Sequence, residues 1–369
     1  MQFVPFFDKD KLSFRIKRGE RGINMRILLG LSGGVDSTYA ALALKEAGHE
    51  VEAAVLLMHE YTSIDEARES ADSLGIPLHV IDVREKFGKV VKANLVSEYT
   101  NARTPNPCVV CNSEIKFKYL LEYAEKNGFD KIATGHYSSI SRLSDENGEY
   151  FGVCRGSDAK KDQTYMLWRL NQKILSKLVL PLEKLSKAEI REKTREKKLF
   201  AADRKDSQEI CFLPDGNYAE YIESVKGKSE KGNFVDENGE ILGEHKGIIH
   251  YTIGQRRGLG ISSSSRIFVT DIDPKTNTVT LSKNDSYATR VKISGVVYSG
   301  MREPCGVCER TLSVKLRYAA PPVSARVVFS GNEAEIFLDA PVRAVTPGQS
   351  AVMYDGDLLV AGGFINEAH

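Results

Sequence analysis

The sequence predicts an α/β fold: a doubly wound parallel sheet, then a small central domain and a C-terminal β-barrel. Three observations predict it. Over residues 25–136, short apolar runs alternate with stretches of helical spacing, a pattern typical of parallel sheets covered by helices. After about residue 206, short strands and glycine turns replace that alternation. From about residue 290, six short strands follow at the spacing of a small barrel.

The elements of the first domain follow from this alternation. Its expected strands are apolar runs at residues 25–31, 50–58, 77–83 and 130–136. Its expected helices, several of which stop at a glycine, span residues 37–47, 65–74, 85–99 and 113–127. Residues 165–200 are expected to be helical and basic, as either a solvated face or a contact to a polyanion. The basic residues concerned are Lys184, Lys187, Arg191, Lys193, Arg195, Lys197 and Lys198.

Changes in the pattern of apolar runs, helical spacing and glycine turns divide the chain into four expected parts. These are a leader at residues 1–24, a catalytic domain at 25–205, a central domain at 206–288 and the barrel at 289–369. Met25 opens the first strand and is the expected natural start, which makes the leader non-native. A mitochondrial transit peptide is disfavoured because the leader is poor in serine and contains acids. The barrel strands are expected at 290–298, 310–318, 324–330, 334–340, 350–356 and 358–365.

The amino-acid composition excludes several classes of protein. The chain has 369 residues, 41% hydrophobic and 27% charged, which is ordinary globular composition and excludes collagen and wholesale disorder. No apolar run approaches the roughly 18 residues that span a bilayer, and no signal peptide opens the chain, so we expect a cytoplasmic protein without a membrane partner. The net charge of +1 means that any nucleic acid must be held by a local patch.

A glycine-rich loop joins the first strand to the first helix. In Ser32-Gly33-Gly34-Val35-Asp36-Ser37, the glycines let backbone N–H groups approach an anion, and the helix N-terminus adds a positive dipole. The serines can bind phosphate, and Asp36 can hold Mg²⁺ or orient the loop. The plainer alternative is a capped strand–helix turn. The loop lacks the GxxxxGK[ST] pattern, so it is not a Walker loop, and it resembles the PP-loop of the N-type ATP pyrophosphatases.

Cysteines form two CxxC pairs. Cys108 and Cys111 can share one metal or cluster, or one can resolve the other. Cys211 lies 100 residues further on and can join them only through the fold. Cys154 is expected to be a core thiol. The pair Cys305 and Cys308 has no second pair to complete a zinc site, and a turn with two incidental thiols is the favoured interpretation.

Eight stretches together resemble the tRNA-specific 2-thiouridylase family. They cover the chain from about residue 25 to residue 365, which makes the match specific. The stretches are SGGVDS (32–37), RTPNPCVVCNSEIKF (103–117), IATGHY (132–137), KKDQTYMLWRL (160–170), DSQEICF (206–212), YTIGQRRGLGI (251–261), VKLRYAAPPVSA (314–325) and TPGQSAVMYDGD (346–357).

The resemblance implies an activity. Such enzymes use ATP, with Mg²⁺, to adenylate C2=O of wobble uridine 34 in tRNAs for Lys, Glu and Gln. They then replace the oxygen with sulfur relayed from a cysteine desulfurase, releasing AMP and pyrophosphate. By similarity, Cys211 carries the persulfide, and Cys111 is the nucleophile or its resolving partner, so that the two form a disulfide in turnover. The carbonyl oxygen needs this activation because it is a poor leaving group.

The resemblance also implies the remaining site residues. ATP is expected at Gly30, Leu31, Ser32, Gly33, Gly34, Val35, Asp36, Ser37, Leu56 and Gly135. The target base is expected at Asn106, Pro107 and Cys108. The tRNA contacts are expected at His136, Lys161, Asp162, Gln163, Arg317, Tyr318 and Gln349. For His136 a satisfied buried histidine is the alternative. The segment GQRRGLG (254–260) is either a hinge or tRNA contact of the central domain, or a surface turn.

Two mechanisms remain open at this point. In related tRNA thiolases, three protein ligands hold a [4Fe-4S] cluster whose free iron binds sulfide. Cys108, Cys111 and Cys211 supply three thiolates, the count that an open-site cluster needs. Persulfide relay and cluster are equally supported by the sequence.

Other functions have less support from the sequence. One alternative is a different PP-loop tRNA sulfurtransferase or an adenylating synthetase; a thiocytidine enzyme would show two CxxC pairs near its loop. Another is a non-catalytic nucleotide-binding protein, which the cysteines argue against. One stretch departs from the family: MHEYTSID (58–65) replaces its usual Trp–acid segment after the second strand. Because this segment lies near the nucleotide or base, it bears on substrate choice.

Overall fold

The computed structural model describes residues 24–369 except residues 203, 205–209, 214 and 263–264. Its first domain is built on a parallel sheet of five strands in the order β3-β2-β1-β4-β7. The four expected strands are confirmed as β1 (Arg26–Gly30), β2 (Glu50–Leu57), β3 (Leu78–Asp82) and the shorter β4 (Lys131–Ala133). The fifth strand, β7 (Leu178–Val179), pairs in parallel with β4.

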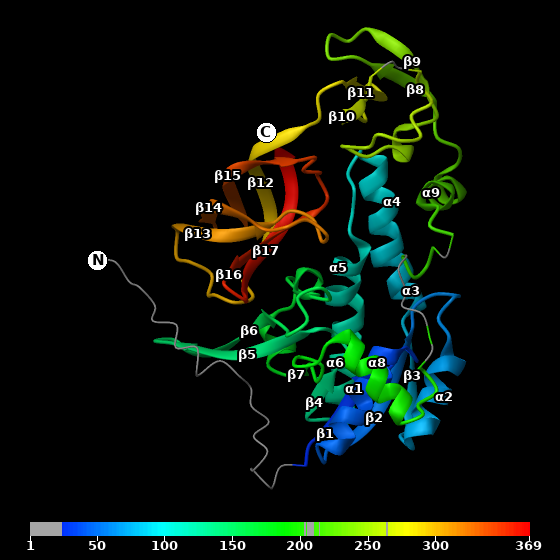
Figure 1. Ribbon diagram of the computed structural model, residues 1–369, viewed down its shortest axis with the longest axis vertical. Helices are drawn as coiled ribbons and strands as arrows, with labels where there is room; N and C mark the ends of the chain where they lie inside the picture. Colours follow the sequence, from blue (N-terminus) through cyan, green and yellow to red (C-terminus); the bar gives the residue numbers. More distant parts are fainter. Residues whose placement is uncertain (1–23, 203, 205–209, 214, 263–264) are drawn as a thin grey trace.

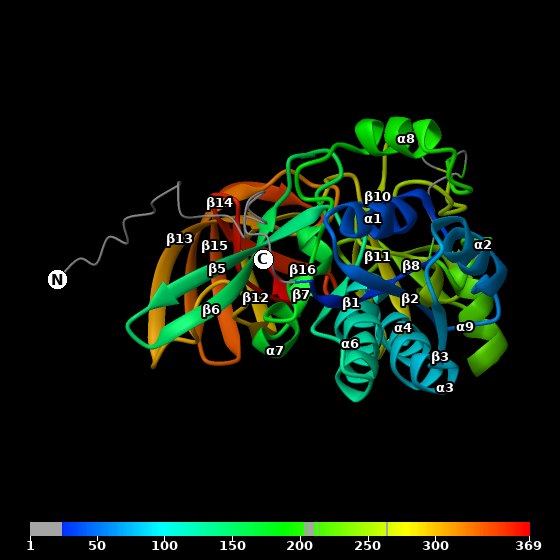
Figure 2. The same ribbon diagram turned by 90° about the horizontal axis from the view of Figure 1, so that it is seen from below.

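Helices cover both faces of this sheet, as a doubly wound fold requires. Figure 2 shows α1 (Val35–Glu46), α2 (Ile64–Leu74) and α8 (Lys187–Glu196) on one face, and α3 (Arg84–Phe87), α4 (Ala93–Thr100) and α6 (Phe117–Lys126) on the other. Each face has its own apolar core, one with Leu29, Ala40 and Ile190 and the other with Leu28, Phe117 and Leu120. The loops at the carboxyl ends of the strands are thereby held between two packed layers.

Two long helical runs each contain a wider π turn. One continues from α3 through η2 (Gly88–Lys92) into α4, and the other from α5 (Pro107–Cys111) through η3 (Asn112–Lys116) into α6. The second run begins at residue 107, earlier than the expected residue 113. The reason is local: the Asn106 side chain accepts a hydrogen bond from the Cys108 N–H at 3.2 Å, and Pro107 stands at the first helical position. Cys108 and Cys111 therefore lie on the first helical turn.

The expectation that residues 165–200 are all helical is wrong. The segment contains η4 (Thr164–Met166), α7 (Gln172–Leu175), strand β7 and only then α8. Asn171 caps α7, and the apolar stretch after it joins the sheet edge instead of continuing the helix. Helix α8 begins afresh at Ser186, which forms a capping box with Glu189.

The rest of the chain forms two β units. The central unit contains α9 (Tyr218–Lys226), β8 (Gly232–Val235), β9 (Ile241–His245), η5 (Ile248–His250), β10 (Phe268–Asp273) and β11 (Thr278–Ser282). The six predicted barrel strands are confirmed as β12 (Tyr287–Val297), β13 (Val307–Lys315), β14 (Val323–Ser330), β15 (Glu333–Arg343), β16 (Ser350–Asp355) and β17 (Leu358–Ala368). Pairing of β12 with β17 closes the barrel.

The barrel is joined to the first domain by shared strands and close packing (Figure 1). The hairpin of β5 (Ser138–Asp145) and β6 (Gly148–Arg155) extends the barrel sheet, because β6 pairs with β17. Trp168 is fully buried, and its Nε1 donates to Ser350 Oγ at 3.0 Å. A Cβ at Gly362 would lie 2.6 Å from the Trp168 ring, so only glycine permits this approach. Among the described helices, none is long and apolar enough to cross a membrane.

Candidate nucleotide and sulfur-transfer site

A cleft of about 460 Å³ lies at the carboxyl ends of β1, β2 and β4. Seven residues expected at ATP line it: Gly30, Leu31, Ser32, Asp36, Ser37, Leu56 and Gly135. Gly33, Gly34 and Val35 belong to the same loop but are not among the lining residues. Gly34 N-caps α1, whose first turn therefore faces the cleft with its positive dipole end. The loop ends of three strands and a helix N-terminus together make a cradle suited to a phosphate chain.

Two glycines fix the shape of the loop. Gly33 has a φ of +79°, and a Cβ there would meet the Glu66 carbonyl at 2.6 Å, so the loop packs directly on α2. Gly135 follows β4, and its Cβ would come within 2.8 Å of the Asp36 carbonyl carbon. The backbone after β4 therefore touches the first turn of α1. Both contacts exclude larger side chains, and this is why glycine stands at each position.

Asp36 is held from two sides. Lys187 Nζ lies 2.7 and 2.8 Å from its two carboxylate oxygens, and the Tyr137 hydroxyl donates to Oδ1 at 2.5 Å. Lys187 is buried, so the expectation that the charges of this helix are either solvated or in contact with a polyanion is wrong at this position. Three hydrogen bonds, two from the ammonium and one from the hydroxyl, therefore fix the orientation of the Asp36 carboxylate.

The three expected thiols come together beside the cleft. Cys211 lines it, and Cys111 Sγ lies 3.8 Å from Sδ of Met58, another lining residue. Surrounding protein atoms that displace water raise the pKa of all three thiols, to about 12 for the buried Cys111. Cys108 and Cys211 also raise the pKa of Cys111, which places the three near one another. All six cysteines are free, including Cys111 and Cys211.

The donor geometry does not match a resident cluster. Across the part of the chain that the structure describes, no three His, Cys, Asp or Glu side chains are grouped so that they could hold a metal ion. A [4Fe-4S] cluster on Cys108, Cys111 and Cys211 would require three thiolates converging on one point, and this convergence is not found.

The loop expected at the target base is clamped by the barrel. Gln349 Nε2 donates to the carbonyl oxygens of Thr104 at 2.8 Å and Pro105 at 3.3 Å. The Thr104 N–H donates in turn to the Pro347 carbonyl at 2.8 Å. Asn106 Nδ2 contacts Met166 Sδ at 3.4 Å, while Pro107 is buried in the first helical turn. The segment 346–350 therefore fixes residues 104 and 105, at the start of this loop.

Several residues expected at tRNA also make contacts within the protein. Asp162 is buried, 3.5 Å from Arg155, and Gln163 Oε1 accepts from the Tyr137 N–H at 3.0 Å. Arg317 binds Thr346 Oγ1 at 2.7 Å and the Ala344 carbonyl, and burial lowers its pKa. Lys161 and Tyr318 are exposed.

His136 lines the nucleotide cleft itself. Its Nδ1 lies 2.8 Å from Thr134 Oγ1, and burial lowers its pKa well below the ordinary value, so it stays neutral. This is close to the alternative of a satisfied histidine.

Three residues that line or support the cleft are not predicted by any sequence motif. Lys187 holds Asp36, and Lys116 lines the cleft at the end of η3. His59, in the segment that departs from the family pattern, is 4% exposed and also lines the cleft. The departure was a usable signal for His59, because the structure places this segment on the same cleft as Ser32 and Asp36. Nothing in the local spacing pointed to Lys187, which reaches Asp36 across 151 residues.

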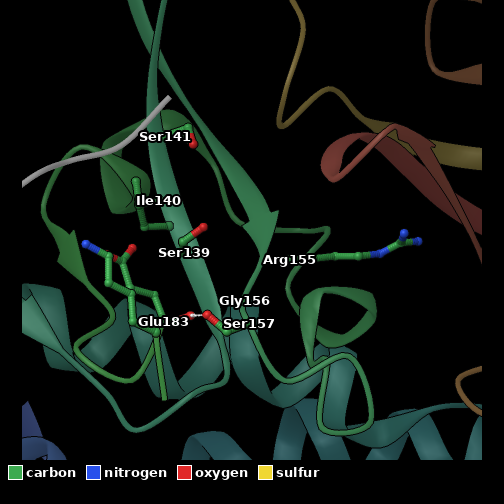
Figure 3. A pocket seen from close by; sticks show the side chains of 8 residues that line it. Ser139, Ile140, Ser141, Arg155, Gly156, Ser157 and Glu183 are labelled. Atoms are coloured by element: carbon green, nitrogen blue, oxygen red, sulfur yellow. Dashed lines mark hydrogen bonds and ion pairs between the residues drawn. The ribbon is translucent and has the colours of Figure 1, made fainter. Parts of the chain in front are cut away.

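Features outside the cleft are separate from it. Arg256 and Arg257 are exposed in the turn of the central unit, while Gly254 packs on Ala344 of the barrel. Cys305 and Cys308 lie at the start of β13. A second hollow, of about 250 Å³, lies between β5 and residues 183–184 (Figure 3) and contains none of the residues expected at ATP, base or tRNA. Its Arg155 extends away from Ser139 and stacks over Tyr354 at 4.4 Å.

Three domain families match this chain in sequence. They are described as the tRNA methyl transferase HUP domain over residues 25–215, the tRNA methyl transferase PRC-barrel domain over 219–283 and the aminomethyltransferase beta-barrel domain over 290–365. These descriptions name methyl and aminomethyl transfer. The full-length relatives carry a different name, and they match all three domains together.

Those relatives are named tRNA-specific 2-thiouridylase MnmA. The protein of Clostridium acetobutylicum is 40% identical, with 93% of this chain and all of the relative covered. That of Carboxydothermus hydrogenoformans is 40% identical over 93% and 98% of the two chains, and that of Clostridium botulinum is 38% identical over 92% and 97%. A solved 4-thiouridine synthetase–RNA complex with bound ATP is 19% identical over 54% of this chain and 50% of that one, with a TM-score of 0.36.

Proposed function

Since this chain belongs to the tRNA-specific 2-thiouridylase family, we propose that the cleft beside its PP-loop binds ATP and passes sulfur from Cys211 to a tRNA uridine. The chain is a tRNA sulfurtransferase that uses ATP and replaces a uridine oxygen with sulfur. The single observation that supports this site is shared geometry. Cys211 lines the same cleft as Ser32, Asp36 and Gly135, so phosphate-binding and sulfur-bearing groups face one another.

In the proposed activation step, the triphosphate lies on the PP-loop and the α1 N-terminus. The uridine O2 attacks the α-phosphorus, the bond to the β-phosphate oxygen breaks, and pyrophosphate leaves. The N3 proton is lost as the C2–O–AMP link forms. Asp36, fixed by Lys187 and Tyr137, holds the loop amides in place. Mg²⁺ would arrive with the triphosphate, and no residue is assigned to it.

In the proposed sulfur step, the terminal sulfur of a Cys211 persulfide attacks C2 as an anion. The C2–S bond forms, the C2–O bond breaks and AMP leaves. The Cys111 thiolate then attacks Cys211 Sγ, which yields a Cys111–Cys211 disulfide and the 2-thiouridine, with a proton returning to N3. A two-electron thiol reductant restores both thiols, and a persulfide donor of the cysteine desulfurase type reloads Cys211.

We propose wobble uridine 34 of tRNAs for Lys, Glu and Gln as the substrate. The loop at residues 104–108 would receive the base, and Lys161, Tyr318, Arg256 and Arg257 would meet the tRNA surface. Support comes from their exposure and from the clamp that Gln349 places on the base loop.

The test is an assay of purified protein with a tRNA transcript, ATP and a persulfide donor, followed by nucleoside mass spectrometry. Wild type should form 2-thiouridine and AMP in equal amounts. Cys111→Ser and Cys211→Ser should lose 2-thiouridine and keep ATP binding, whereas Asp36→Ala should lose AMP formation. Cys305→Ser is the matched control, since this thiol lies at the barrel. Thiolation retained by Cys111→Ser or Cys211→Ser would contradict the relay.

The same preparation separates relay from cluster. Protein purified without oxygen should contain no stoichiometric iron, and Cys108→Ser should keep most of the activity. Iron and sulfide in the wild type, together with an inactive Cys108→Ser protein, would replace the relay with the cluster mechanism.

A further inference from the structure

Lys116 brings an uncompensated positive charge to the cleft. It is half-buried, and among the described residues that line the cleft it is the single lysine or arginine. The two carboxylates among these described lining residues are already paired, Asp36 with Lys187 and Glu66 with Arg204. Among the residues that the structure describes, none forms a hydrogen bond or an ion pair with the Lys116 ammonium. Removing an ammonium partly from water without a partner costs free energy, and an anion that binds beside it during the reaction would offset this cost.

The helix that carries Lys116 also carries two of the thiols. In an α-helix, a residue five positions further on points about 140° away, so Lys116 would turn from Cys111. The π turn η3 spans Asn112–Lys116 and winds more loosely, with i→i+5 hydrogen bonds. This looser winding brings Lys116 back toward the side of the helix on which Cys111 lies. Cys211 reaches the same cleft from a different segment.

Among the residues that the structure describes, no other cation acts on all three thiols. The Lys116 ammonium lowers the pKa of Cys108, Cys111 and Cys211, opposing the larger rise that displacement of water by surrounding protein atoms causes in each. The two histidines facing the cleft do not supply a positive charge in place of Lys116, because burial lowers the pKa of His59 and His136 and both stay neutral. The neighbouring cysteines act in the opposite direction, since Cys108 and Cys211 raise the pKa of Cys111. For Cys211, backbone N–H groups add a smaller stabilisation.

We propose that Lys116 supplies the positive charge that stabilises the sulfur anion on the cleft cysteines during transfer. This inference rests on the proposed sulfur relay. A phosphate is the less suitable partner, because the PP-loop amides and the α1 N-terminus already provide for it. Lys116 instead belongs to the helical run of the cysteines.

The experiment measures the rate of iodoacetamide alkylation at Cys108 and Cys211 against pH, in ligand-free protein, with each site followed by peptide mass spectrometry. Lys116→Met should move the midpoint upward by about one pH unit, which lowers the rate at pH 8 about tenfold. Lys116→Arg should restore the wild-type midpoint. Lys118→Met is the matched control, since Lys118 is exposed two residues further along the same helical run. Lys116→Gln gives the same reading if the methionine variant does not fold.

ATP binding and 2-thiouridine formation complete the test. Lys116→Met should bind ATP within twofold of wild type, and its slower thiolation should recover as the pH rises. An unshifted alkylation midpoint would overturn the proposal, and an unshifted midpoint with tenfold weaker ATP binding would make Lys116 a phosphate ligand instead. If the wild-type protein forms no 2-thiouridine, the proposed function fails, while the alkylation midpoint still decides the charge effect of Lys116.

Discussion

The Asp36 carboxylate shows how much of this site depends on single side chains. Its two oxygens are occupied by one ammonium and one hydroxyl, from segments 151 and 101 residues away. The loop geometry therefore depends on α8 and on the end of β4 as much as on the loop sequence. Removing either partner would allow the Asp36 carboxylate to rotate into another orientation.

The variant Lys187→Met should lower the rate of ATP cleavage at least tenfold, because the carboxylate that orients the loop loses its charged partner. The measurement is pyrophosphate release with saturating tRNA. Lys184→Met serves as the control, since its ammonium is exposed and only 3.8 Å from Glu183. Equal rates for the two variants would show that the ion pair does not orient the loop.

Single-turnover sulfur transfer should accelerate with pH. The pKa of Cys111 is raised to about 12 by burial, and those of Cys108 and Cys211 are also raised. A thiol loses its proton as the pH rises, so the reactive thiolate should increase about tenfold per unit between pH 7 and 9. His136 does not add a step, because its lowered pKa keeps it neutral. Rapid-quench assays at fixed ionic strength measure this, and a flat profile would exclude thiolate attack as the slow step.

Residue types and spacing predicted most of the cleft but not its charge balance. SGGVDS, Cys211 and Gly135 were recognisable because each belongs to a short motif, and the structure places all three motifs on one cleft. Lys187 and Lys116 were not, since one reaches its partner through the tertiary fold and the other depends on a π turn that no propensity rule anticipates.

Among the elements, the close approach of the β4 end to α1 makes Gly135 a sensitive position. Gly135→Ala should displace the first turn of α1 and weaken ATP binding at least tenfold, because the new Cβ would lie 2.8 Å from the Asp36 backbone. Isothermal titration with a non-hydrolysable ATP analogue measures the effect. Gly88→Ala is the matched control: its added Cβ meets nothing within 4 Å, and alanine favours the helix there. Unchanged affinity in Gly135→Ala would show that α1 tolerates the shift.

Element boundaries show where sequence patterns stop being sufficient. The alternation of apolar runs gave the strands of the sheet and barrel to within a few residues. The sequence predicts helix throughout residues 165–200 because the charges there mask two short apolar segments, one of which pairs with β4. The helix of the cysteines was expected too late because its cap, Asn106 with Pro107, looked like part of a loop.

The whole molecule has a net charge of only +1, so its overall charge attracts tRNA little. Binding of tRNA must therefore depend on local contacts with basic side chains. We expect the affinity to fall with salt, and Arg256→Ala with Arg257→Ala to reduce the log–log slope by about two phosphate contacts. Arg317→Ala should change the slope less, because its guanidinium is engaged by Thr346 and Ala344. Filter binding from 50 to 300 mM KCl, on the order of the range over which such slopes are resolved, measures both. A salt-independent Kd would contradict electrostatic recognition.

The clamp of Gln349 on residues 104–105 has a consequence for synthesis of the protein on the ribosome. The PP-loop and its helices can fold as soon as the first domain emerges, and ATP can then find its cradle. Until segment 346–350 arrives, residues 104 and 105 of the base loop lack the contacts that Gln349 makes to their carbonyl oxygens. A nascent or prematurely terminated chain would therefore hold nucleotide without presenting a base to it, so translation must run almost to the last strand before the protein can act on tRNA.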